Sequence, residues 1–169
     1  MIRMLGAVMV AFGALWAGWR ASAELRDSVR AVEAVIDGLE LLEQELWEHG
    51  TALPELLEDL SGRTRDPVRT LFAQCARACQ ELDRFPFGES WRRLTEDLSE
   101  LSPEGRAALL PLGEVLGRYE ADGQRTALKR AEEALERERE RAEKERDRMG
   151  RVYQILSLAG GAFLVILLL

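Results

Sequence analysis

Apolar and polar positions divide the chain into two apolar ends and a long charged middle. From Val152 to Leu169 no side chain is charged, and at 1.5 Å per residue this stretch makes a helix of about 27 Å. That length is close to the ~30 Å of a bilayer's hydrocarbon core. A second apolar stretch runs from Met4 to Trp19. The pattern predicts a transmembrane helix at residues 1–20, a helical domain at 21–151 and a second transmembrane helix at 152–169.

The N-terminal stretch is also compatible with a secretory signal peptide. Arg3 would supply the positive start of such a peptide, and Ala21-Ser22-Ala23 resembles its cleavage site. As a membrane span the stretch is a little short, and Trp16 and Trp19 at the interface would make up the difference. The second apolar end and the charge of Arg20 favour a retained span.

Two long helices are predicted next to the apolar ends. Between Ala21 and Glu48 apolar residues recur at steps of three and four, which places them on one helix face. From Gly123 to Arg151 no proline occurs and strong helix formers dominate. Glu138 and Glu145 fall on the apolar seam of this second helix, so it is not a self-sufficient coiled coil. We therefore predict that the two helices pack antiparallel as a stalk.

Prolines mark the starts of two short helices after the first long one. Pro54 stands at the first turn of a predicted helix that ends near Leu60, and Pro67 begins a helix that reaches about Asp83. The polar residues from Ser61 to Pro67 are predicted to form the loop between them.

Two further short helices complete the predicted bundle. A turn at residues 85–88 precedes a helix from Glu89 to Leu101, and Ser102 is placed to cap the next helix. Pro111 lies inside that last helix, which extends to Gly117, and is expected to kink or break it. The predicted fold is all-α: a bundle of short helices on a long two-helix antiparallel stalk, with a transmembrane helix at each end.

Charge and motifs exclude several classes of function. The net charge of −7 and the pI near 5.0 argue against a nucleic-acid-binding protein. Cys75 and Cys79 lie four apart on one predicted helix face, where two small core residues are expected rather than a disulfide. His49 is the only histidine, so a zinc site lacks ligands. Because phosphate-binding and nucleotide-binding motifs are missing too, we expect no enzyme, cofactor, metal or small-molecule substrate.

Arginines flank the central domain on both sides. Cationic residues next to a membrane span favour the cytoplasmic side, so the domain is expected in the cytoplasm and both termini outside. The arginines are Arg20, Arg26 and Arg30 after the first span, and Arg146, Arg148 and Arg151 before the second.

A block of glycines and leucines forms the candidate site. Gly113 and Gly117 lie four apart on one predicted helix face, which permits close approach of another helix. Two interpretations remain open: helix packing inside the domain, and a docking surface for a partner. The candidate residues are Leu112, Gly113, Leu116, Gly117, Glu120, Gly123 and Gln124.

Small residues in the apolar ends are candidates for helix packing in the membrane. Such residues let helix backbones approach closely, either between the two spans or with a partner's span. They are Ala14, Gly18, Gly160 and Gly161.

The chain resembles the stage III sporulation protein AB family over nearly its whole length. The most specific block is Leu112 to Gly117 followed by Gly123-Gln124, which resembles the family's paired Leu-Gly steps and its Gly-Gln. Tyr119-Glu120 departs from the family, which often has Ser-Asp there. The other similar blocks are Leu5-Gly6, Leu41 to Leu46, Gly50 to Leu56 and Tyr153 to Leu169.

The resemblance implies a function that the residues alone do not show. Members are mother-cell membrane proteins that face the forespore, and they belong to the secretion-like channel complex of endospore formation. They are similar to the cytoplasmic domains of platform proteins of type II secretion and type IV pilus systems. The implied partners are the membrane, a cytoplasmic secretion-type ATPase and other membrane subunits of the channel. The implied role is a non-catalytic subunit that couples the ATPase to membrane components.

Two other classes of function stay open. One is an inner-membrane platform subunit of a pilus or secretion machine outside sporulation; such proteins usually repeat the helical domain, of which this chain has one copy. The other is a secreted helical binding domain released by signal cleavage.

Overall fold

The computed structural model describes residues 26–48, 51–81, 85–116 and 121–168 of the 169-residue chain. All regular structure in these residues is helical, which confirms the all-α prediction. The chain divides into two compact units. Residues 28–140 form one, and the other is formed by residues 1–27 and 141–169.

The helix of residues 26–48 is buried along two stripes rather than one. A second stripe of small residues, including Ala31, Ala34 and Gly38, is buried as well. A Cβ atom added at Gly38 would lie 2.6 Å from Cγ1 of Val68, so the helix that begins at Val68 approaches as closely as a glycine allows. The predicted stripe is buried at Val29, Val32, Leu39 and Leu42.

Helix α2 spans Leu53–Arg63 and has its proline in the first turn, as predicted. It continues past Leu60, so the predicted loop at residues 61–63 is wrong. The Ser61 hydroxyl donates to the Glu58 carbonyl at 2.7 Å, and Arg63 pairs along the helix with Asp59. These local interactions favour the additional turn.

Helix α3 spans Val68–Ala78 and is followed by the short 3-10 helix η1, Cys79–Glu81. The α-helix therefore ends earlier than the predicted Asp83. Cys75 is buried, Cys79 is half-buried, and both are free thiols, which confirms that they are core residues. Burial raises the pKa of both thiols, that of Cys75 to about 12.

Helix α4 spans Phe87–Glu96, so it begins two residues before the predicted start and ends well before Leu101. Pro86 provides an extended residue immediately before the helix. Arg106 binds carbonyl groups at this early end of α4. Its Nη1 donates to the carbonyls of Glu96 and Leu98 at 3.4 and 3.5 Å. An arginine that binds these carbonyl groups stabilises the helix terminus.

The next segment consists of two short helices, α5 (Pro103–Leu109) and α6 (Leu112–Val115). Ser102 caps α5 as predicted, because its Oγ accepts a hydrogen bond of 3.0 Å from the Gly105 N–H. The break between α5 and α6 falls at Pro111, which confirms the predicted interruption.

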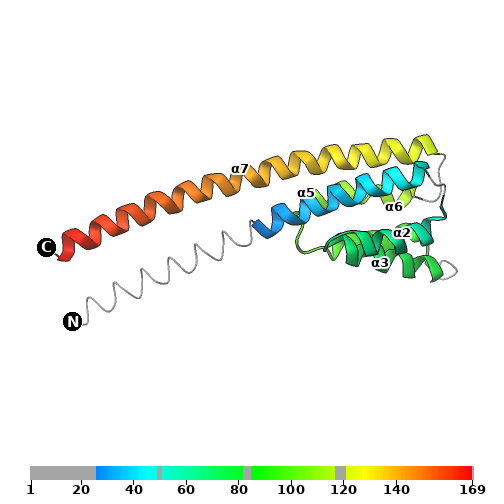
Figure 1. Ribbon diagram of the computed structural model, residues 1–169, viewed down its shortest axis with the longest axis horizontal. Coiled ribbons are helices and arrows are strands. Elements are labelled where there is room, and N and C mark those ends of the chain that lie inside the picture. Colours follow the sequence, from blue (N-terminus) through cyan, green and yellow to red (C-terminus); the bar gives the residue numbers. More distant parts are fainter. Residues whose placement is uncertain (1–25, 49–50, 82–84, 117–120, 169) are drawn as a thin grey trace. The chain divides into compact units, whose positions relative to one another are not determined.

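Helix α7 is continuous from Ala121 to Leu168 and starts two residues before the predicted Gly123. Within the unit of residues 28–140, its early turns lie beside the helix of residues 26–48 (Figure 1). Three of its residues, Leu128, Ala131 and Leu135, are buried in the same core as Trp91.

In the other unit, α7 carries apolar side chains that are exposed to solvent. Ile155 is 69% and Leu156 61% exposed. Among the described residues, no helix combines the length and the apolar character needed to cross a membrane. The predicted span at residues 1–20 lies outside the described residues. The predicted span at 152–169 coincides with the end of α7 and stays a prediction.

Candidate functional site

The glycine–leucine block lies at α6, where most of its described residues belong to the core. Leu112 and Leu116 are 1% and 2% exposed, and Gly113 is also buried. A short helix that turns its leucines and its glycine inward uses these residues to pack inside the domain. A docking role for these residues stays a prediction.

Trp91 of α4 is the residue against which α6 packs. A Cβ atom at Gly113 would lie 2.6 Å from Cδ1 of Trp91, closer than any real side chain comes. The indole N–H of Trp91 donates to the Leu109 carbonyl at 2.8 Å, which satisfies its only polar group in a fully buried position. Phe87 adds a ring contact with 6.0 Å between centroids.

Gly88 of α4 is a second glycine in the packing of α4 against α6. A Cβ atom at Gly88 would approach the Gly113 carbonyl oxygen to 2.9 Å. Two glycines, one in α4 and one in α6, therefore let two backbones approach each other beside the indole ring.

The predicted helix end at Gly117 is wrong, because α6 ends at Val115 and Leu116 is extended with ψ 124°. Gly117 and Glu120 lie outside the described residues. Gly123 is exposed and Gln124 is half-buried in the first turns of α7. A docking role for this end of the block stays a prediction.

The predicted membrane-packing residues are placed only in part. Ala14 and Gly18 lie outside the described residues. Gly160 is an exposed position of α7, and no atom of the described residues lies within 4 Å of an added Cβ. Gly161 follows it in the helix. Their packing role stays a prediction.

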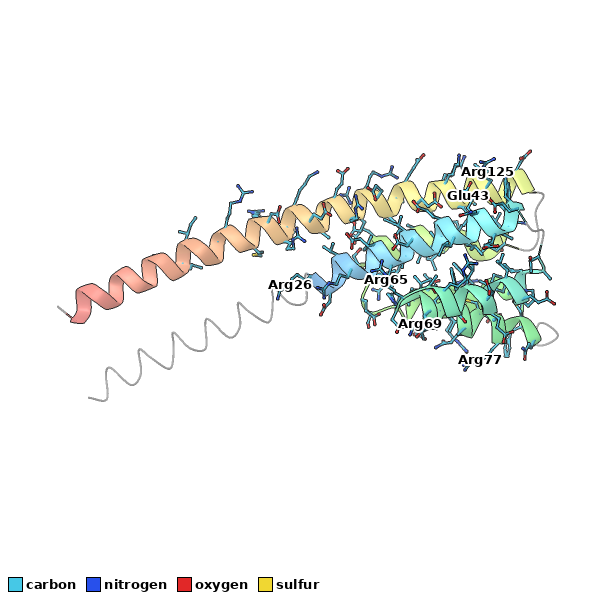
Figure 2. All side chains as sticks on the ribbon, in the orientation of Figure 1. Arg26, Glu43, Arg65, Arg69, Arg77 and Arg125 are labelled. Atoms are coloured by element: carbon cyan, nitrogen blue, oxygen red, sulfur yellow. The ribbon has the colours of Figure 1, made fainter. Side chains whose placement is uncertain are left out.

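A polar and aromatic cluster, unexpected from the sequence, joins the helix of residues 26–48 to α7. Nε of Arg125 donates to Oε1 of Glu43 at 3.0 Å (Figure 2). The guanidinium also lies 5.5 Å from the centre of the Trp47 ring. A guanidinium that contacts a carboxylate and an aromatic face uses both its charge and its planar surface. The pairing of residue 125 with residues 43 and 47 also fixes the start of α7 against the end of the other helix.

Glu132 lies about two turns further along α7 and faces the carboxylates of Glu43 and Glu40. Desolvation, then the charges of Glu43 and Glu40, raise its pKa to about 7, while Lys129 acts in the opposite direction. Its Oε1 is buried and has no hydrogen-bond partner among the described residues. Since residue 125 meets 43 and 47 whereas residue 132 meets 40 and 43, the two helices run antiparallel in this unit.

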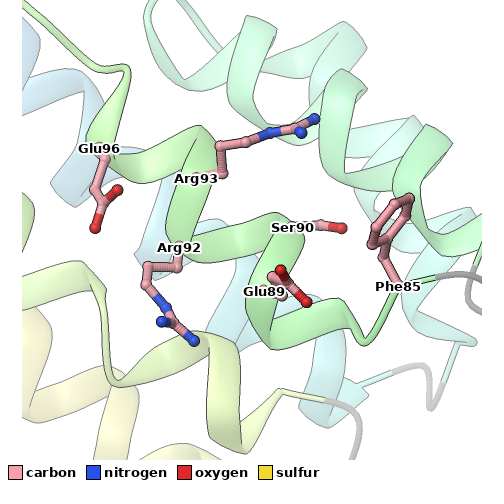
Figure 3. A pocket seen from close by; sticks show the side chains of 6 residues that line it. All are labelled: Phe85, Glu89, Ser90, Arg92, Arg93 and Glu96. Carbon is pink, nitrogen blue, oxygen red and sulfur yellow. The ribbon is translucent and has the colours of Figure 1, made fainter.

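The exposed side of α4 forms a pocket of about 240 Å³ (Figure 3). Phe85 at its edge is 51% exposed. Arg92 and Arg93 line it together with Glu89 and Glu96. Two cations and two anions balance one another, so this pocket selects no ligand by charge. Among the described residues, no group of His, Cys, Asp or Glu side chains is arranged to hold a metal ion.

The fold and the site define an all-α module. In this module the leucines and the glycine of α6 pack against the buried Trp91. A family model described as "Stage III sporulation protein AB (spore_III_AB)" matches residues 3–169. The chain belongs to this family, as its resemblance indicated, and has a role related to sporulation.

A solved structure carries the same fold. It is titled "Stage III sporulation protein AB (SpoIIIAB)" and is 21% identical in sequence, with a TM-score of 0.63. The match covers 71% of this chain and 96% of that chain. A comparison with curated proteins found no match.

Replacing Gly113 by alanine is expected to destabilise the domain by about 1–3 kcal/mol, because the new methyl group collides with the Trp91 ring. Urea unfolding of the full chain in detergent, followed by tryptophan fluorescence, measures the effect. Gly62→Ala in α2 is the matched control, because no atom lies within 4 Å of its added Cβ. The control is expected to be neutral or slightly stabilising. Equal stability of the two variants would contradict the close contact.

Replacing Glu132 by glutamine is expected to stabilise the protein at alkaline pH. The pKa of Glu132 is raised from 4.5 to about 7 in the folded state, so the folded chain binds more protons than the unfolded chain between these values. The contribution of Glu132 to the free energy of unfolding therefore falls as pH rises through this window. Glu132→Gln should exceed the wild type in thermal stability at pH 8.5, with a smaller gap at pH 6.

The neighbouring Glu133 offers the control for this prediction. Glu133→Gln removes the same charge from an exposed position on α7. Its stability relative to the wild type should change little between pH 6 and 8.5. A Glu132→Gln variant with the same relative stability at both pH values would show that the carboxylate does not titrate in this window.

Proposed function

We propose that this protein is a non-catalytic, membrane-anchored subunit of the secretion-like complex between mother cell and forespore. In this proposal its helical domain faces the cytoplasm and couples a secretion-type ATPase to membrane components. Family membership supports the sporulation context. The two apolar ends of the sequence, flanked by arginines on the domain side, support the anchors and the orientation.

The observation that carries the coupling proposal is the continuity of α7. It begins at Ala121 in the helical unit and runs without a break to Leu168 at the apolar end. Its buried residues Leu128 and Leu135 hold it in the core of the unit. A continuous helix is stiff, so a displacement of the domain would be carried along α7 to the proposed anchor. In this proposal α7 and the helix of residues 26–48 form the antiparallel stalk.

The membrane orientation is tested by protease protection in spheroplasts of a sporulating host, with a tag at each end of the full chain. Both tags are expected to be cut, whereas the helical domain is protected by the membrane. Digestion of the domain from outside would exclude contact with a cytoplasmic ATPase and would favour an extracellular scaffold. An N-terminus shortened after Ala23 would favour the secreted domain.

Coupling through α7 is tested at Gly150. This position is exposed, with no atom within 4 Å of an added Cβ, and it lies beyond the unit of residues 28–140. Gly150→Pro breaks the helix at a cost of about 3 kcal/mol without touching the core. We expect it to reduce spore formation strongly while ATPase binding and the level of the protein in the membrane are retained.

The matched control is Gly150→Ala, which fits the same space and strengthens a helix by about 0.5–1 kcal/mol. It should support sporulation like the wild type. Normal sporulation of Gly150→Pro, at equal protein level, would refute coupling through a continuous α7. It would leave the sporulation role intact.

A further inference from the structure

An acidic groove lies where the start of α3 meets the end of α4. Its volume is about 220 Å³, below the roughly 300 Å³ at which small-molecule sites begin. The space is therefore suited to one or two side chains of a protein partner. Three carboxylates lie along the groove, on Asp66, Asp97 and Glu100, and three leucines line it, Leu71, Leu94 and Leu98.

The groove has a uniform charge, in contrast to the pocket on the exposed side of α4. No lysine or arginine lines it, whereas the other pocket contains Arg92 and Arg93 beside its two glutamates. The groove therefore has a net negative potential, and the pocket in Figure 3 does not. Charge complementarity singles out a cationic occupant for the groove.

Nearby cations neutralise the groove only in part. Within the described residues, the Asp97 carboxylate forms no ion pair. Arg69 forms a long ion pair of 4.0 Å with Asp66, and the Thr70 hydroxyl donates to the same carboxylate at 2.8 Å. Nη1 of Arg106 is bonded to the carbonyl groups at the end of α4.

The leucines add a second requirement to the occupant. Leu71 and Leu98 are buried at the base of the groove, whereas Leu94 is half-buried, so Leu94 offers apolar surface beside the carboxylates. Lysine and arginine combine an aliphatic stem with a charged head, and these side chains lay their stems on apolar surface while the head reaches a carboxylate. A segment with such residues matches both features of the groove.

We propose that the groove between α3 and α4 binds a lysine- or arginine-bearing segment of the cytoplasmic ATPase, with Asp66, Asp97 and Glu100 receiving its charges. This inference rests on the ATPase partner proposed above and assigns the surface that the partner contacts. It places that contact away from the leucine–glycine block, whose described leucines are buried.

The test measures binding of the purified ATPase to the full chain in nanodiscs, by biolayer interferometry at low and high salt. Asp97→Lys/Glu100→Lys reverses two of the three charges and is expected to weaken binding roughly tenfold. Wild-type binding should also weaken with salt, because exposed charge pairs are screened. A lysine at Asp97 suits the helix C-terminus, so the variant should keep its fold, which circular dichroism verifies.

The matched control is Glu58→Lys/Glu96→Lys. Both residues are exposed and lie outside the groove, and the variant makes the same change in net charge. It should bind the ATPase like the wild type. Equal weakening of both variants would show that net charge, rather than the groove, governs binding, and would overturn the proposed surface.

The chemistry of the occupant is read by photo-crosslinking. A photoreactive residue at Gln74, in the groove, should crosslink to a segment of the ATPase that contains lysine or arginine, whereas one at the exposed Gln80 should not. A crosslink to a segment without these residues, or to a second copy of this chain, would overturn the inference.

The two proposals fail in different ways. If the wild type binds the ATPase but Asp97→Lys/Glu100→Lys binds equally well, the groove assignment is wrong and the coupling role stands. If the wild type does not bind the ATPase, both the coupling role and this surface are refuted.

Discussion

The close approach between Gly38 and Val68 is the constraint on which the rest of the helical unit depends. It allows the helix of residues 26–48 to be buried on a second side, so that α3 packs where a one-sided amphipathic helix would face water. Packing at this distance needs small residues on one side of the contact. With that contact made, the helix becomes the element around which the unit is assembled.

Ion pairs on the exposed side of the helix of residues 26–48 align the neighbouring segments with it. Arg63 of α2 contacts Glu45, and Arg65 contacts Asp37. Arg125 of α7 contacts Glu43 (Figure 2). Exposed pairs of this kind contribute about 0–1 kcal/mol each, so the buried residues supply most of the stability. The pairs instead specify which face of each neighbour meets the central helix. Packing and orientation are also separate around Trp91. Gly88 and Gly113 allow α4 and α6 to approach closely, and the hydrogen bond from the indole to the Leu109 carbonyl orients the ring.

The sequence predicted those parts of the fold that depend on local rules. Pro54, Ser102 and Pro111 act through their own backbone, so the helix starts and the break between α5 and α6 were predictable. The stripe of alanines and Gly38 was not, because small residues carry a weak hydrophobic signal. The pairing of Arg125 with Glu43 joins residues 82 positions apart, and no local pattern reveals such a contact. The leucine–glycine block was recognised, but only the structure shows that its partner is Trp91.

The two thiols of α3 have a consequence for chemical probing of the protein. Thiol reagents attack the thiolate form, and burial keeps both native cysteines protonated at neutral pH. Cys75 is also inaccessible to a reagent in the folded state. A single cysteine introduced on the surface would therefore react ahead of the native pair. Maleimide labels for distance or accessibility measurements can then be placed in an otherwise native sequence, and the reaction of Cys75 would report unfolding.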